Sequence, residues 1–241
     1  MYINISMKDI FSLNIKEFSL SNDIKYWIVY NIFDNNEIKI IENFFEKQNY
    51  NLNNNHLMEN PLLLKHNYEI PYINYFKSIL KNITLKYNTT LRNKDYIYTD
   101  YYKFWINSYN SFNSKKSKQN VFIPHIDDSA GIVGNYWLSK NLESSGTKLF
   151  KYNGNIYYMT DDDKSLFIYD ENFDYKLFDP IIEYNKWYNI DNQILEKNNL
   201  IFQGIVPCVY NSITIYNANV PHIPFINENI VKRNSISFLL K

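Results

Sequence analysis

The sequence predicts a mainly β protein of the α+β class, in which two helices come first and an antiparallel, many-stranded region follows. Two observations support this prediction. Apolar residues recur at helical spacing in two segments before residue 94. From residue 95 onward, short runs rich in Tyr, Ile, Phe, Val and Trp alternate with clusters of Asn, Ser, Gly and Asp. We therefore expect the helices to pack on one outer face of a β-sandwich or open barrel.

Both helices are indicated by the spacing of their apolar residues. The first is expected at residues 37–48, after a short β-branched and aromatic strand at residues 26–33. Asp34, between the two, is typical of a helix start. The second helix is expected at residues 73–85, directly after Pro71.

The remaining strands are expected after residue 95. They are residues 96–109, 121–126, 132–138, 147–152, 155–159, 165–169, 200–210, 212–217 and 235–240. No shift of composition divides the chain, so residues 1–241 are expected to form one domain, with the helices in residues 1–94 and the strands in residues 95–241.

Composition and charge narrow the functional classes. Lys and Arg number 25 and Asp and Glu number 25, so no net field attracts a nucleic acid or an anionic membrane. The single cysteine, Cys208, excludes an internal disulfide and fits a reducing compartment; we interpret it as a buried small hydrophobe. No apolar run is long enough for a membrane helix, and the N-terminus lacks a signal-peptide pattern. A cytoplasmic, soluble protein is expected.

Two histidines and one aspartate have the spacing of a metal site. His125 and Asp127 stand two residues apart on a predicted strand, so their side chains share a face and can bind one ion. His222 follows the strand at residues 212–217, 97 residues after His125. Two His and one carboxylate on one face of a metal leave the opposite positions open, which suits non-haem Fe(II) and O₂ activation.

A possible anion site follows on the last strand. Arg233 comes 11 residues after His222, and Ser235 shares its face by strand alternation. A guanidinium can bind a carboxylate with two hydrogen bonds, and a hydroxyl beside it can donate one more. Lys232 is the competing cation, but alternation with Ser235 favours Arg233.

In this order, His-x-Asp, a distant His and Arg-x-Ser on the last strand resemble the Fe(II)/2-oxoglutarate-dependent oxygenase superfamily, and its prolyl-hydroxylase-like branch in particular. The resemblance implies a double-stranded β-helix of the jelly-roll type with N-terminal supporting helices. It also implies that His125, Asp127 and His222 bind Fe(II), and that Arg233 and Ser235 bind the distal carboxylate of 2-oxoglutarate.

Weaker marks extend the resemblance. Residues 144–150, Ser-Ser-Gly-Thr-Lys-Leu-Phe, are similar to a Gly-Gly-x-Leu-x-Phe turn and strand of the superfamily, and they contain Thr147 as an expected cofactor-binding residue. Tyr109 lies where members of the branch often have a Tyr that contacts 2-oxoglutarate. The long gap between the two histidines implies an inserted hairpin or lid at residues 153–198.

The activity implied by the resemblance is hydroxylation with O₂ and 2-oxoglutarate as co-substrates. Asp127 favours hydroxylation over halogenation, because halogenating relatives have a small residue at that position. A peptidyl side chain is favoured as the substrate, and a small molecule stays open, as does the oligomeric state.

Two other classes stay open as well. A non-catalytic jelly-roll binding or structural module predicts that Arg233 is salt-bridged or distant from the other site residues. A cupin-type metalloenzyme without 2-oxoglutarate normally has more histidines. The two other histidines, His56 and His66, are expected at the surface, and the acidic run at residues 161–163 is expected at a hairpin tip.

Overall fold

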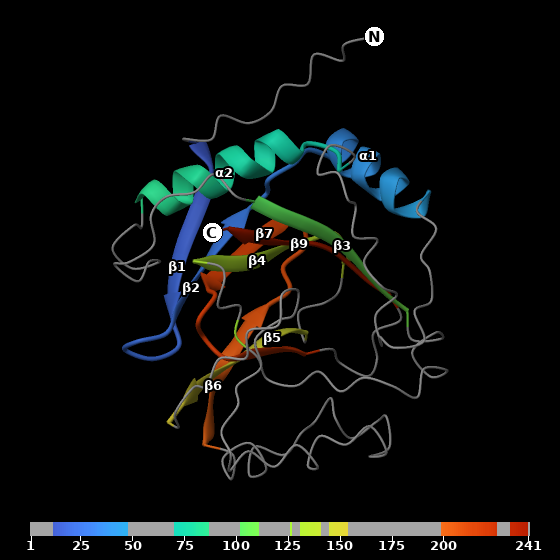
Figure 1. The fold of residues 1–241 in the computed structure, drawn as a ribbon. Helices are drawn as coiled ribbons and strands as arrows, with labels where there is room; N and C mark the ends of the chain where they lie inside the picture. The colour runs from blue at the N-terminus through green and yellow to red at the C-terminus, as the bar shows by residue number, and fades with distance from the viewer. Residues whose placement is uncertain are drawn as a thin grey trace.

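The computed structural model describes residues 12–47, 70–86, 102–110, 126, 131–140, 145–153, 199–225 and 232–240. These residues form two helices and nine strands, so the prediction of a mainly β, α+β protein is confirmed (Figure 1). In chain order the elements are β1 (Asn14–Ser19), β2 (Lys25–Tyr30), α1 (Asn35–Glu46), α2 (Ile73–Lys86), β3 (Tyr102–Asn110), β4 (Ile132–Trp137), β5 (Gly146–Tyr152), β6 (Leu200–Pro207), β7 (Ser212–Asn217), β8 (His222–Phe225) and β9 (Lys232–Leu240).

The strands form two antiparallel sheets. The large sheet has six strands in the order β1-β2-β7-β4-β9-β3, and the small sheet has three in the order β6-β5-β8. Figure 1 shows both helices on one side of the large sheet and the small sheet on its other side. The predicted packing of the helices on one outer face is therefore confirmed. Among the described residues, no helix is long and apolar enough to cross a membrane.

Helix α1 begins at a complete capping box. The Asp34 side chain accepts hydrogen bonds from the backbone N–H groups of Asn36 and Glu37, at 2.8 and 2.9 Å. The Glu37 side chain in turn accepts from the Asp34 backbone N–H at 2.8 Å. This reciprocal pairing satisfies donors that a helix start leaves open, and it begins the helix two residues earlier than predicted.

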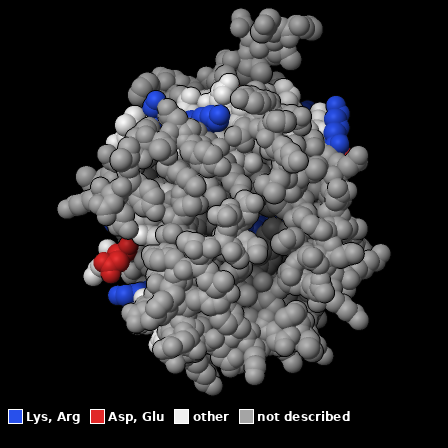
Figure 2. All heavy atoms as spheres, in the orientation of Figure 1, with Lys and Arg blue, Asp and Glu red and all other residues white. Residues whose placement is uncertain are grey.

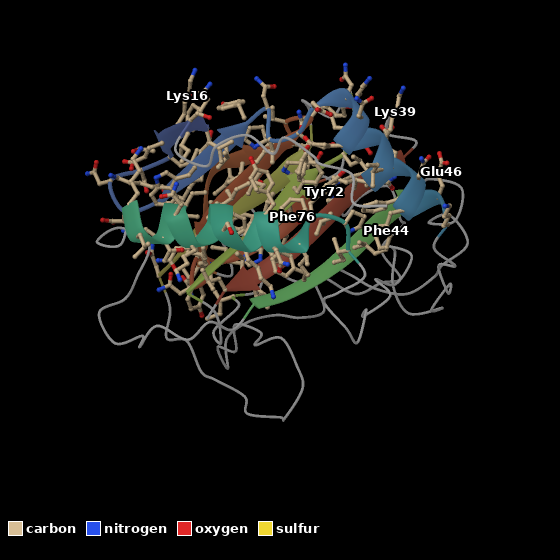
Figure 3. The ribbon with its side chains drawn as sticks, turned by 90° about the horizontal axis from the view of Figure 1, so that it is seen from above. Lys16, Lys39, Phe44, Glu46, Tyr72 and Phe76 are labelled. Carbon is tan, nitrogen blue, oxygen red and sulfur yellow. The ribbon has the colours of Figure 1, made fainter. Side chains whose placement is uncertain are left out.

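Each face of the large sheet has its own apolar core. The core on the helix side includes Phe76 of α2, whose ring lies 5.3 Å from those of both Phe33 and Tyr136. Figure 3 shows Phe76 over the sheet, whereas the charged residues Lys16, Lys39 and Glu46 lie at the periphery. The core between the sheets consists of Ile24, Tyr26, Ile28, Val133, Leu149, Val206, Tyr216, Ala218 and Val220.

Two strands were not predicted from the sequence. β1 is an edge strand whose residues are all exposed or partly exposed, so its apolar pattern is weak. β8 has only four residues and includes Pro224, which is uncommon in strands. β6 ends at Pro207, three residues before the predicted end.

Several predictions of strands lie outside the described residues. They concern residues 155–159 and 165–169, the insertion from residue 154 to residue 198, and residues 121–126 apart from Ile126. Ile126 is buried and is not part of a strand. The surface positions expected for His56, His66 and residues 161–163 also lie outside the described part.

The neighbouring strands leave no space for a Cβ atom at Gly134, in the middle of the large sheet. A Cβ atom at this position would lie 2.0 Å from the Thr214 backbone oxygen and 2.6 Å from Cζ of Phe238. The first contact is with backbone of the neighbouring strand β7, which cannot move aside without breaking the sheet. Glycine is therefore required here by space.

We expect Gly134→Ala to lower the free energy of unfolding by about 3 kcal/mol or more, because the added methyl overlaps a backbone oxygen. Gly131→Ala is the matched control, since a Cβ there meets only the Leu240 backbone oxygen at 3.7 Å, an ordinary contact. Chemical denaturation of both variants measures the difference. Equal stabilities would show that the sheet relaxes around residue 134.

Candidate functional site

Alternation along β9 divides its residues between the two cores. Ile236, Phe238 and Leu240 belong to the core on the helix side. Arg233 and Ser235 therefore point to the other side, toward the small sheet, and both are buried. The prediction that these two side chains share a face is confirmed.

The Arg233 guanidinium has very few polar partners for a buried cation. Its Nη2 donates to the Gly146 backbone oxygen at 3.5 Å, the outer limit of a hydrogen bond. Its Nε and Nη1 are buried without a hydrogen-bond partner. Among the described residues the two ion pairs are Lys25–Glu17 and Lys151–Asp23, so Arg233 has no carboxylate partner there.

Two side chains without charge border this guanidinium. The Cζ atom lies 4.6 Å from the ring centroid of Trp137, which is fully buried on the neighbouring strand β4. Cys208 lies on another side. Burial raises the pKa of its thiol to about 11, although the nearby Arg233 acts to lower it. The thiol is therefore protonated at physiological pH and is no counter-ion, as expected for a buried small hydrophobe.

His222 and Thr147 lie on the facing small sheet. Leu149 belongs to the core between the sheets, so Thr147, two residues before it on β5, points the same way. β8 pairs with β5 so that His222 lies opposite Leu149. The His222 ring stands edge-on to Tyr216 of the large sheet, with ring centroids 5.0 Å apart. His222 and Thr147 are both buried between the sheets.

A backbone hydrogen bond sets the orientation of the His222 ring. Its Nδ1 lies 2.9 Å from the Val220 backbone oxygen. Because a carbonyl oxygen only accepts, Nδ1 must carry the proton of this bond, and in the neutral ring the lone pair then lies on Nε2. A His held by a backbone carbonyl in this way is suited to bind a metal through Nε2.

Strand geometry gives the spacing between the two ends of the site. Arg233 contacts Gly146, and His222 lies opposite Leu149, three residues further along β5. Three residues of a strand span about 10 Å. Thr147 lies between these two positions on the same strand. The arrangement can thus place an anion beside the start of β5 and a His ligand beside the middle of this strand.

A second buried cation, Lys148, was not noticed in the sequence. It follows Thr147 on β5 and points to the opposite face of the small sheet, where its Nζ lies 4.7 Å from the Phe225 ring centroid and 5.9 Å from that of Phe202. Burial lowers the pKa of its ammonium group. Figure 2 shows Lys and Arg side chains at the periphery of one face, whereas Lys148 and Arg233 are the buried basic residues of the described part.

The other predicted site residues lie partly or wholly outside the described part. His125 and Asp127 fall there, as does the side chain of Tyr109, whose backbone on β3 pairs in register with Arg233. Within the described residues no three His, Cys, Asp or Glu side chains come together. A metal centre that includes His222 therefore needs ligands from elsewhere in the chain, for which His125 and Asp127 remain the prediction.

No protein-family model matches this chain, and no curated protein is significantly similar to it. The functional assignment therefore depends on the residues of the site. Trp137 and Cys208 are the neighbours of Arg233 that sequence reasoning missed. Their contact with it depends on strand pairing over long sequence distances, for which the sequence has no local signal.

We expect Arg233→Met to raise the free energy of unfolding by about 1 kcal/mol. Each buried donor without a partner costs roughly 1–3 kcal/mol, more than the stacking on Trp137 returns. Arg233→Lys, which keeps the charge, should give no such gain. Denaturant titration of both variants measures the effect. A clear loss of stability in Arg233→Met would mean that the guanidinium supports the fold instead of a ligand.

Cys208 should resist thiol reagents in the folded protein. A pKa near 11, two units above the usual 9, lowers the thiolate fraction about 100-fold at pH 8, and the side chain is also buried. With one cysteine in the chain, a chromogenic disulfide reagent reports on this thiol alone. Reaction should be at least ~100-fold slower than in denaturant. Equal rates would show that the thiol is accessible.

Proposed function

We propose that this protein is an Fe(II)- and 2-oxoglutarate-dependent dioxygenase that hydroxylates its substrate. The observation that carries the proposal is the buried Arg233 guanidinium, which lies between two sheets with Nε and Nη1 unpartnered. A buried charge is costly unless an opposite charge accompanies it. The 2-oxoglutarate molecule supplies such a charge at the carboxylate far from its metal-binding end.

The strand order supports a jelly roll as the architecture. In an eight-stranded jelly roll, strand 1 pairs with 8, 3 with 6 and 4 with 5, in two facing sheets. Counting β3 as the first strand, the pairs β3–β9, β4–β7 and β5–β6 follow this scheme. The remaining strand, β8, then requires a partner between β3 and β4, where the sequence predicts the strand at residues 121–126.

This assignment would bring the predicted ligands together. In the jelly-roll scheme the strand predicted before Ile126 would pair with β8, which begins at His222. His125 and Asp127, at the end of that strand, would then complete a site of two His and one carboxylate with the Nε2 atom of His222. The open positions opposite these ligands are where 2-oxoglutarate and O₂ would bind.

The described residues around Arg233 fit the distal carboxylate of 2-oxoglutarate, the end that would lie away from the metal. Arg233 would pair with the distal carboxylate in a region shielded from water, where charge-assisted hydrogen bonds are strong. Ser235 on β9 and Thr147 on β5 are buried between the sheets, and their hydroxyls would add hydrogen bonds to the carboxylate. The two backbone positions lie about 10 Å apart along β5, so a five-carbon dicarboxylate would extend along this strand from the anchor toward the metal.

Fe(II) and 2-oxoglutarate supply the oxidising chemistry when bound: R–H, O₂ and 2-oxoglutarate are converted to R–OH, succinate and CO₂. The role of the chain is to orient the co-substrate through Arg233 and to exclude water with the apolar walls of Trp137 and Leu149. A peptidyl side chain is proposed as the substrate through the resemblance to the prolyl-hydroxylase-like branch, with a small molecule as the alternative.

The competing hypotheses account less well for Arg233. A non-catalytic jelly-roll module predicts that it is salt-bridged or distant from the other site residues, yet it has no ion pair within the described part and lies between the same sheets as His222. A cupin-type enzyme without 2-oxoglutarate leaves a buried guanidinium with no ligand to bind.

The proposal predicts a weak visible charge-transfer band when the protein is mixed anaerobically with Fe(II) and 2-oxoglutarate. His222→Ala should abolish the band by removing a metal ligand, and Arg233→Ala should abolish it at ordinary 2-oxoglutarate concentrations by removing the anchor. Lys148→Met is the matched control, because it removes a buried cation that points away from the site.

Absorbance spectra and iron content of the four proteins decide the matter. A band present in the unaltered protein and in Lys148→Met only would support the proposal. The absence of a band, with iron at background level, would exclude it and favour a binding or structural module.

A further inference from the structure

We propose that Trp137 is a positioning residue that holds the Arg233 guanidinium ready for its carboxylate ligand and so sets the affinity for 2-oxoglutarate. This inference rests on the proposed function. Trp137 is fully buried on β4, and its ring centroid lies 4.6 Å from Cζ of Arg233. In register, Trp137 pairs with Ser235, which makes Arg233 its diagonal neighbour on the same face of the sheet.

The indole ring is itself fixed by the neighbouring strand. Its Nε1 donates to Oγ1 of Thr214 on β7 at 2.9 Å. The Thr214 hydroxyl donates in turn to the Asn135 backbone oxygen at 3.4 Å. The hydroxyl therefore donates its proton to the backbone of β4 and accepts the indole N–H through a lone pair. These two bonds give the ring one preferred orientation.

A fixed indole is effective as a support for arginine in particular. A guanidinium is planar and can stack on an aromatic ring while its edges stay available to a carboxylate. Its hydrogen bond to the Gly146 backbone oxygen is 3.5 Å long, and its other polar neighbour is the weakly interacting Cys208 thiol, so these contacts alone orient it poorly. The contact with Trp137 therefore adds to the orientation that Arg233 has before a ligand binds.

Orientation before binding affects affinity. A long side chain that is already ordered loses less conformational entropy when it forms its hydrogen bonds, and the ligand binds more tightly as a result. The distal carboxylate is remote from the bond-forming atoms. Loss of the support should therefore weaken the binding of 2-oxoglutarate and leave the rate at saturation unchanged.

Three variants separate positioning from folding. Trp137→Leu removes the stacking surface, Trp137→Phe retains part of it, and Thr214→Val removes the anchor of the indole with little change of shape. Trp27→Phe is the control: Trp27 is equally buried in the large sheet and bonded to Glu17, but it belongs to the core on the helix side.

Calorimetric titration of 2-oxoglutarate into the Mn²⁺-loaded protein measures the affinity directly, and succinate formation with Fe(II) gives KM and kcat. We expect Trp137→Leu to weaken binding about 10-fold, with smaller losses in Trp137→Phe and Thr214→Val, and no change in Trp27→Phe. If Trp137→Leu does not fold, the two conservative variants still give the order of affinities.

The outcomes distinguish this inference from the function on which it rests. Equal affinities in all variants, or a fall in kcat at unchanged affinity, would overturn the role of Trp137 and leave the proposed function intact. Absence of 2-oxoglutarate binding to the unaltered protein would overturn both.

Discussion

The rest of the site depends on one constraint, the burial of the Arg233 charge between two sheets. An arginine stays protonated at all physiological pH values, so it cannot relieve its burial by losing a proton. Its hydrogen bonds within the protein leave Nε and Nη1 unused. No carboxylate accompanies this charge within the part of the chain that the structure describes, and under the proposed function a bound anion would compensate it.

The two faces of the large sheet differ in polarity. The face under the helices is apolar and closely packed, with Phe76 against the rings of Phe33 and Tyr136. The other face contains a row of buried polar side chains beside Arg233, among them Ser237, which donates a short hydrogen bond to Asn135. Burial on the first face adds to the stability from the apolar core between the sheets, and together they offset the cost of the buried polar groups on the second face. Because the two faces belong to the same strands, packing on one face lets these strands tolerate buried polar groups on the other.

The sequence predicted what depends on local periodicity. The helix α2 and the shared face of Arg233 and Ser235 follow from spacings of three to four and of two residues, and both were predicted correctly. The exposed edge strand β1 has no such pattern and was missed. The contact of Arg233 with Trp137 arises from the pairing of β9 with β4, almost 100 residues apart, and no local signal reveals it.

The comparison of the two buried cations shows why Arg233 and not Lys148 is assigned to a ligand. Lys148 lies on β5, and Arg233 contacts Gly146 of the same strand. Neither residue has an ion pair among the described residues. The Lys148 ammonium lies near two phenylalanine rings, and burial lowers its pKa, so it loses its proton more readily than a solvated lysine does. A guanidinium has no such alternative. Under the proposed function a bound carboxylate would compensate the charge of Arg233, which gives the burial of this residue a role.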